Sequence, residues 1–203
     1  MGANGAGKST LVKILCGAYG ADAGSIVVGG RALLAASPRQ ARAHGVIAVH
    51  QTIADTGVPT LSVADNLLLD RYCASNDLLF AAGRSKYRAA RKIAEGIRLD
   101  IDLKRQLGTL SIAERRLVAI ARAVSHEPTL LILDEPTASL SAPESERLFA
   151  VIDDLRGRGV AILYISRKLG DLRKIADRVV VLRDGGVVGN YMKPIDSPTP
   201  FSP

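Results

Sequence analysis

The chain begins with the stretch Gly2-Ala3-Asn4-Gly5-Ala6-Gly7-Lys8-Ser9, which matches the pattern G-x-x-x-x-G-K-[ST] at every fixed position. Its glycines permit the backbone turns that aim successive N–H groups at one concave site, and that geometry suits phosphate oxygens. Lys8 adds a positive charge, and Ser9 adds a hydroxyl that suits Mg²⁺. The pattern therefore predicts a site for a nucleoside triphosphate.

An apolar periodic pattern follows this loop and predicts a helix that starts at the loop, with Leu11, Val12, Ile14 and Leu15 on its apolar side. The N-terminus of that helix would face the same phosphates, and its dipole favours negative charge. A loop of this kind ordinarily connects a strand to such a helix. We therefore expect that the anchoring strands are absent and that the chain is a fragment.

Composition indicates one globular domain and excludes several other classes of protein. The chain has 203 residues, and 47% of them are hydrophobic, which suffices for a sizeable core. The longest apolar runs are far shorter than the roughly 18 residues of a membrane-spanning helix, and no secretory signal opens the chain. Two cysteines and three histidines are scattered, which argues against a disulfide framework or a zinc-type site. We expect a cytoplasmic protein.

The net charge of +7 is mostly dispersed along the chain. One richer stretch, residues 84–105, carries eight basic residues interrupted by Glu95, Asp100 and Asp102, and Tyr87 is its only aromatic residue. Such a stretch is more typical of a solvated helical face than of a nucleic-acid surface. We therefore expect no nucleic-acid partner.

The order of helical and strand patterns predicts an α/β fold with a parallel-strand core. Residues 25–28, 45–49, 130–133, 160–165 and 179–182 have strand character, and residues 142–155 and 169–177 have helical character. Residues 61–125 predict an inserted helical subdomain, with Ser62 as an N-cap and Asp65 three residues later. Residues 191–203, rich in proline and serine, predict an unpacked tail.

A second motif with chemical character is the apolar run Leu130–Leu133 followed by Asp134 and Glu135. A buried strand that ends in two acids places carboxylates at the edge of the sheet where α/β proteins bind ligands. Asp134 is a candidate Mg²⁺ ligand, and Glu135 is a candidate general base for an attacking water.

Between these motifs lies Leu110-Ser111-Ile112-Ala113-Glu114, which has the spacing of a capping box. Ser111 would cap the helix, while Glu114 would reach back to the N–H of the cap. A capped helix N-terminus with a serine hydroxyl is also a suitable site for a γ-phosphate. Both interpretations remain open for Ser111.

The order of the phosphate loop, Gln51, the Leu110-Ser111 motif, Asp134-Glu135 and Tyr164-Ile165-Ser166 resembles the ATP-binding cassette of ABC transporters. The nearest likeness is to the first cassette of monosaccharide-importer ATPase subunits. It covers residues 1–190 as a truncated P-loop NTPase domain, with residues 1–55 and 126–190 as the nucleotide-binding core and 61–125 as the helical subdomain.

The resemblance implies roles for particular residues. Glu135 would be the general base, and Gln51 would sense Mg²⁺ and couple to a transmembrane partner. Ser111 would meet the nucleotide held by a second cassette, fused or in trans. ATP would contact Asn4, Gly5, Ala6, Gly7, Lys8, Ser9 and Thr10, and Mg²⁺ would contact Ser9, Gln51 and Asp134.

At the switch position, the family usually has histidine and this chain has Arg167. Arginine can donate to a γ-phosphate but stays protonated, and it does not orient water as imidazole does. We expect Arg167 to belong to the catalytic site, with ATP binding preserved and hydrolysis slow.

The resemblance implies ATP hydrolysis that powers carbohydrate import through permease subunits, with a periplasmic sugar-binding protein acting indirectly. The chain would then sit peripherally on the cytoplasmic face of the inner membrane. Two alternatives are a soluble ABC-type protein that acts on DNA or ribosomes, and an inactive cassette fragment.

Overall fold

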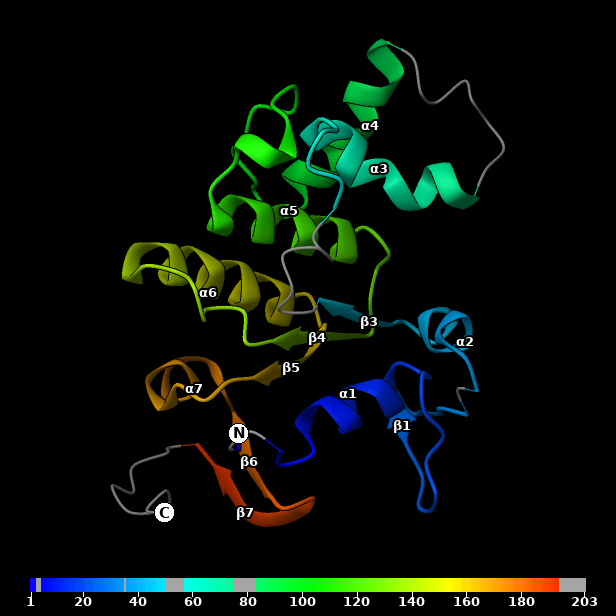
Figure 1. Ribbon diagram of the computed structural model, residues 1–203, viewed down its shortest axis with the longest axis vertical. Helices are drawn as coiled ribbons and strands as arrows, with labels where there is room; N and C mark the ends of the chain where they lie inside the picture. Colours follow the sequence, from blue (N-terminus) through cyan, green and yellow to red (C-terminus); the bar gives the residue numbers. More distant parts are fainter. Residues whose placement is uncertain (3–4, 35, 50–56, 75–82, 194–203) are drawn as a thin grey trace.

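The computed structural model describes residues 1–2, 5–34, 36–49, 57–74 and 83–193 (Figure 1). Its helices are α1 (Lys8–Leu15), α2 (Pro38–Ala43), α3 (Val63–Ala74), α4 (Arg84–Glu95), α5 (Ile112–Val124), α6 (Ala142–Gly157) and α7 (Leu169–Ile175), with a short 3-10 helix η3 at Leu107–Thr109. Its strands are β1 (Val27–Val28), β2 (Arg31–Ala32), β3 (Val46–Val49), β4 (Leu130–Asp134), β5 (Ala161–Ile165), β6 (Arg178–Arg183) and β7 (Gly186–Met192).

Three strands form the parallel core in the order β3-β4-β5. The central strand β4 is covered on both faces, because α5 and α6 lie on one side of the sheet and α1 lies on the other (Figure 1). Leu131 and Leu133 pack in a cluster with Leu148 of α6, whereas Ile132 packs in a second cluster with Val12 of α1. This burial on both faces explains why β4 is a continuous apolar run. The prediction of an α/β fold with a parallel core is confirmed.

The strand predicted at 179–182 does not join the parallel sheet. It lies in β6, which pairs with β7 in the antiparallel direction. The turn between the two strands contains Asp184 with a φ of 49° and Gly185 with a φ of 79°. Two successive residues with positive φ favour a tight hairpin, so local turn chemistry gave β6 a sequence neighbour as its partner. β7 also extends to Met192, two residues into the segment predicted as a tail, while residues 194–203 lie outside the described residues.

The strand predicted at 25–28 is shorter and likewise belongs to a hairpin. Only β1 is a strand there, and it pairs with β2 across a turn made by Gly29 and Gly30, whose φ values are 56° and 75°. The same turn geometry accounts for this pairing.

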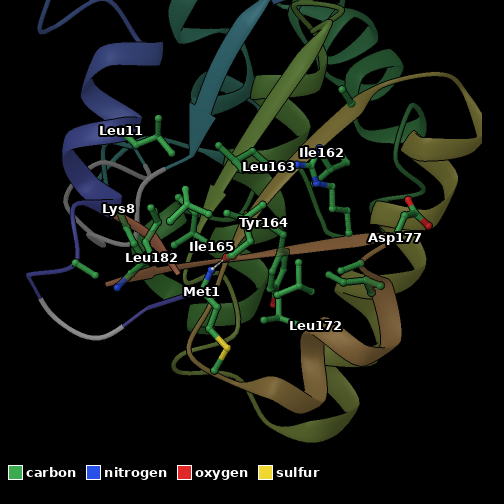
Figure 2. Close-up of a pocket in the computed structure, with 18 of the residues that line it drawn as sticks. Met1, Lys8, Leu11, Ile162, Leu163, Tyr164, Ile165, Leu172, Asp177 and Leu182 are labelled. Atoms are coloured by element: carbon green, nitrogen blue, oxygen red, sulfur yellow. Dashed lines mark hydrogen bonds between the residues drawn. The ribbon is translucent and has the colours of Figure 1, made fainter. Parts of the chain in front are cut away.

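A cavity of about 1080 Å³ lies between β5 and β6, and Figure 2 shows the side chains that line it. Its walls are largely apolar, with Ile162 of β5 facing it from one side and Leu172 of α7 from another. At one end Met1 is joined to β6, because its ammonium group donates to the Val180 carbonyl and its carbonyl accepts from the Leu182 N–H, each at 2.8 Å. Lys8 lines the same cavity, so the loop before α1 lies against the edge of β6.

The helical segment of residues 61–125 shares one hydrophobic core with the parallel sheet. Leu67 of α3, Ile93 of α4 and Val118 of α5 are buried in the cluster that also contains Leu131 of β4. The helix start at Ser62 is as predicted, since its hydroxyl accepts the N–H of Asp65 at 3.1 Å. The helical stretch is therefore packed directly on the core rather than held by linkers alone.

An ionic cluster centred on Asp70 ties α3 to its neighbours. The Asp70 carboxylate lies 2.8 Å from Nε2 of His126, 3.4 Å from the Arg42 guanidinium and 3.9 Å from that of Arg122. Burial alone would raise the pKa of Asp70, but the hydrogen bond with His126 and the two arginine charges hold this pKa below its usual range.

Candidate functional site

The glycine turns expected of the first loop are present. Gly5 and Gly7 have φ values of 80° and 92°, which glycine adopts without strain. Gly7 is the N-cap of α1, so Ser9 and Thr10 stand exposed in the first turn of that helix. A Cβ added at Gly2 would lie 2.3 Å from the Leu182 carbonyl oxygen, so close packing on β6 requires glycine there. Asn4 lies outside the described residues. Ala6, between Gly5 and Gly7, is buried.

The Lys8 side chain is turned back over this loop. Its Nζ donates to the Gly2 carbonyl at 2.6 Å. The ammonium group therefore lies beside the N-terminus of α1, where the helix dipole already favours an anion. A phosphate group at this point would meet backbone N–H groups, a helix N-terminus and a positive charge together.

The two acids stand at the carboxyl edge of the parallel sheet. Asp134 is the last residue of β4 and pairs in register with Ile165, the last residue of β5. Glu135 follows with a φ of 43°, a backbone conformation rarely taken by a residue that has a side chain. Its N–H donates to the Ile165 carbonyl at 2.8 Å, and its own carbonyl accepts from Arg116 Nη1 at 3.2 Å. These bonds compensate for the unfavourable backbone conformation.

Arg116 is a residue of this site to which the sequence analysis gave no role. Its exposed fraction is only 4%, and burial lowers the pKa of its guanidinium, an effect that Tyr164 and Asp134 partly offset. Helical spacing could have revealed its position, because Arg116 lies three residues after Ala113 and four before Ile120, both of which are buried.

Arg167 and Glu135 are brought together from adjacent strand ends. Arg167 Nε lies 2.8 Å from Glu135 Oε1, and Arg167 Nη2 lies 3.1 Å from Glu135 Oε2. The carboxylate is 13% exposed and the guanidinium side chain is 51% exposed. The sequence suggested a γ-phosphate as the partner of Arg167, whereas the described contact is a two-point ion pair with the candidate base.

A small polar network fixes the loop that carries Arg167. Thr137 and Tyr164 both donate hydrogen bonds to the Asp171 carboxylate, and Lys168 Nζ donates to the Thr137 carbonyl at 2.7 Å. Burial, together with the nearby Asp171 charge, raises the pKa of Tyr164, so its hydroxyl remains a donor. The Lys168 N–H donates to Ser166 Oγ at 2.9 Å. The segment after β5 is thereby joined to the segment after Glu135.

Ser111 is placed by the predicted capping box, which is confirmed. Its hydroxyl accepts the Glu114 N–H at 3.1 Å, and its own N–H donates to the Glu114 carboxylate at 2.7 Å. It is exposed at the start of α5, on the other side of the sheet from α1 (Figure 1). The fold therefore does not bring Ser111 to the loop at Gly2–Thr10. Gln51 lies outside the described residues.

The available donor set fits a magnesium ion. The Ser9 hydroxyl and the Asp134 carboxylate are hard oxygen donors, which Mg²⁺ prefers. Within the described ranges, no three His, Cys, Asp or Glu side chains gather closely enough to cage a metal ion. Mg²⁺ bound with a nucleotide needs only one or two protein ligands, because phosphate and water oxygens complete its coordination.

The described part of the chain also contains no helix with the length and apolar character needed to cross a bilayer.

Comparisons with known proteins agree with these features. The family model described as "ABC transporter" matches residues 1–138. A Burkholderia cenocepacia protein named as a ribose/galactose/methyl galactoside import ATP-binding protein is 45% identical over 188 residues, which are 93% of this chain and 36% of the relative. The ribose import ATP-binding protein RbsA of Geobacillus kaustophilus is 39% identical over 93% of this chain and 38% of its own length. The chain thus spans little more than a third of these relatives.

A crystal structure of the ADP conformation of an ATP-binding cassette of an ABC transporter superposes with a TM-score of 0.81. It is 25% identical, and the match covers 95% of this chain and 78% of that one. The sequence similarity and the shared fold lead to one conclusion: the chain belongs to the ABC transporter family and has the fold of its ATP-binding cassette.

Proposed function

We propose that the chain binds ATP at the Gly2–Thr10 loop and hydrolyses it to power the import of a carbohydrate through a membrane permease. The observation that carries the proposal is the loop itself, where two left-handed glycines, the N-terminus of α1 and Lys8 converge. The names of the longer relatives support a pentose or hexose as the cargo. Transport itself would be a property of the longer assembly.

Residues 4–10 of the loop each have a proposed contact with the nucleotide. The backbone N–H groups of Asn4 to Ser9 would bind the phosphate oxygens, and Lys8 would leave the Gly2 carbonyl to contact the β- and γ-phosphates. Thr10, in the exposed first turn of α1, would donate its hydroxyl to a phosphate.

Glu135 would act as the general base. Its carboxylate takes a proton from water while the water oxygen forms a bond to the γ-phosphorus. The bond from the γ-phosphorus to the bridging oxygen breaks, and its electron pair leaves with ADP. Lys8 and the backbone N–H groups of the loop would stabilise the charge on the phosphates during this step.

Ser9, Asp134 and Gln51 would hold Mg²⁺. When bound, this ion would neutralise part of the phosphate charge. Asp134 stands directly before Glu135, so one strand end would position both a metal ligand and the base.

Membership of the ABC transporter family supports the proposed partners. Ser111, exposed at the start of α5, would contact the nucleotide bound by a second cassette. Gln51 and the α3–α4 helices would dock on the permease, which would hold the chain at the cytoplasmic face of the inner membrane. Recovery of permease subunits when the chain is purified from membranes would support this proposal, whereas recovery with DNA or ribosomes alone would contradict it.

The replacement Glu135→Gln tests the catalytic part of the proposal. We expect ATP binding to be retained and phosphate release to fall by about 10²- to 10⁴-fold, which is typical for loss of a positioned base. Glu144→Gln is a matched control, because Glu144 is a partly exposed capping residue of α6 that should not affect turnover. Unchanged phosphate release in the Glu135 variant would remove this residue from the mechanism, and an absence of ATP binding in the unchanged chain would contradict the site.

A further inference from the structure

The candidate base is held from several directions at once. Its backbone N–H is bound to the end of β5, its carbonyl is bound to the buried Arg116, and its side chain is bound to Arg167. With a φ of 43°, Glu135 also has little conformational freedom of its own. The direction of its carboxylate is therefore set by what its two oxygens contact.

Both carboxylate oxygens face the same cation. Arg167 donates from Nε to Oε1 at 2.8 Å and from Nη2 to Oε2 at 3.1 Å, which is the fork geometry of a two-point arginine–carboxylate pair. A general base must direct a lone pair at the proton of the attacking water. In the described arrangement, the guanidinium occupies the lone pair on each oxygen that faces Arg167. A water molecule can then use those lone pairs only by displacing an N–H group, which leaves it the outer lone pair of each oxygen.

The position of Arg167 is also fixed. The residues on both sides of it are held, because Ser166 is buried and Lys168 donates to the Thr137 carbonyl. Thr137 is in turn bound to Asp171 of α7. The guanidinium is thus presented to Glu135 by a braced loop, although half of its side chain is exposed to solvent.

We propose that Arg167 is a positioning residue that restrains Glu135 in a resting orientation, which the carboxylate must leave before it takes a proton from water. The inference rests on the proposed role of Glu135 as the base. It differs from a direct contact between Arg167 and the γ-phosphate, because the effect of Arg167 is then exerted through the carboxylate.

The size of the effect follows from the exposure of the pair. An ion pair with one exposed partner contributes little free energy, and that contribution corresponds to a factor of roughly two to five in a rate or an equilibrium constant. Removal of the guanidinium should therefore raise kcat by about two- to fivefold. The KM for ATP should change by less than this factor, because the restraint acts on the base and not on the nucleotide.

The test compares kcat and KM of the unchanged chain with those of Arg167→Ala and Arg167→Lys. Lysine provides a single ammonium group in place of the fork, so its increase in kcat should be smaller than that of alanine. Arg173→Ala is the control, because Arg173 is an exposed arginine of α7, six residues further along the same segment. In a Glu135→Gln background, Arg167→Ala should no longer raise kcat.

Three changes in kcat would each overturn the proposal: a fall in kcat for Arg167→Ala, a rise that persists in the Glu135→Gln background, or an equal rise for Arg173→Ala. A large increase in KM with constant kcat would also overturn it, since this would place Arg167 on the nucleotide.

A second measurement does not depend on hydrolysis. Urea unfolding of Glu135→Gln, Arg167→Ala and the double variant forms a double-mutant cycle. If the ion pair exists, the fall in the urea midpoint of the double variant is smaller than the sum of the falls in the two single variants. Falls that simply add would overturn the proposal. A chain that shows this coupling but never hydrolyses ATP would refute the proposed function while leaving the ion pair established.

Discussion

Replacing Asn66 with alanine should lower the free energy of unfolding much more than the replacement of an exposed polar residue would. Asn66 lies in the first turns of α3, and none of its surface is exposed. Its Oδ1 accepts the Val58 N–H at 2.8 Å, while Nδ2 donates to the carbonyls of Val58, Leu61 and Ser62 at 3.0, 3.3 and 2.9 Å. The side chain therefore holds the whole segment that precedes the helix.

The magnitude depends on which groups lose their last partner. Each of the three carbonyls keeps another donor, because Val58 also accepts from the Leu61 N–H, Leu61 from the Leu107 N–H, and Ser62 from the Asn66 N–H. Among the described residues, the Val58 N–H has no acceptor other than Asn66. One unsatisfied donor costs about 1–3 kcal/mol, and the lost packing of the amide adds to this. We expect a total loss of about 2–4 kcal/mol.

Urea unfolding monitored by circular dichroism would measure this loss, with an expected fall in midpoint of about 1 M. Gln40→Ala is a matched control, since Gln40 Oε1 also accepts a backbone N–H at 2.8 Å, but in an exposed turn. Water can replace that bond, so the control should lose less than about 1 kcal/mol. Equal losses in the two variants would refute the assignment of the effect to burial.

Three further replacements test other parts of the structure. Asp70→Asn should reduce the free energy of unfolding at neutral pH. Because the pKa of Asp70 is lowered in the folded state, the stability that its carboxylate contributes is complete above the unfolded pKa and is lost as pH falls through the folded pKa, where the difference from the unchanged chain should vanish. Urea unfolding from neutral pH down through the folded pKa measures this difference. Gly7→Ala forces a side chain into a φ of 92° at a strain of about 1–2 kcal/mol, so ATP affinity should fall roughly tenfold by calorimetry. At Gly45 an added Cβ would lie 2.6 Å from Thr129 Oγ1, so Gly45→Ala should lower the melting temperature by several degrees. Gly159→Ala is the control, because Gly159 also has a positive φ, 85°, but a Cβ added there would meet open space, so the melting temperature should fall less.

The local elements could be read from the sequence, because each depends on residues close together in the chain. The turns at Gly5 and Gly7 follow from the missing Cβ, and the capping box at Ser111 follows from a three-residue spacing. The apolar run 130–133 predicted a buried strand for a similar reason, since a strand covered on both faces has no polar side. The order of these motifs was sufficient to indicate the family.

Partners far apart in the chain were decided only by the tertiary structure. The sequence placed Arg167 beside a nucleotide, whereas the fold places it on Glu135, 32 residues away. It gave no role to Arg116, whose guanidinium is buried and reaches the Glu135 carbonyl. The contact of Arg167 depends on the register of β4 against β5, and the contact of Arg116 depends on how α5 packs against β4. Periodicity within one segment predicts neither arrangement.

The pairing of β6 differs from these contacts, because a local turn decides it. The apolar pattern of 179–182 determined that a strand forms, but an apolar pattern is satisfied equally by a parallel or an antiparallel neighbour. The tight turn at Asp184 and Gly185 gave β6 its partner in β7. The sequence by itself thus determined which segments are helices, strands and glycine turns, because these follow from short-range sterics and hydrogen bonding. Only the tertiary structure decided which distant segments meet, because the free energy of those contacts comes from burial and charge shared between segments far apart in the chain.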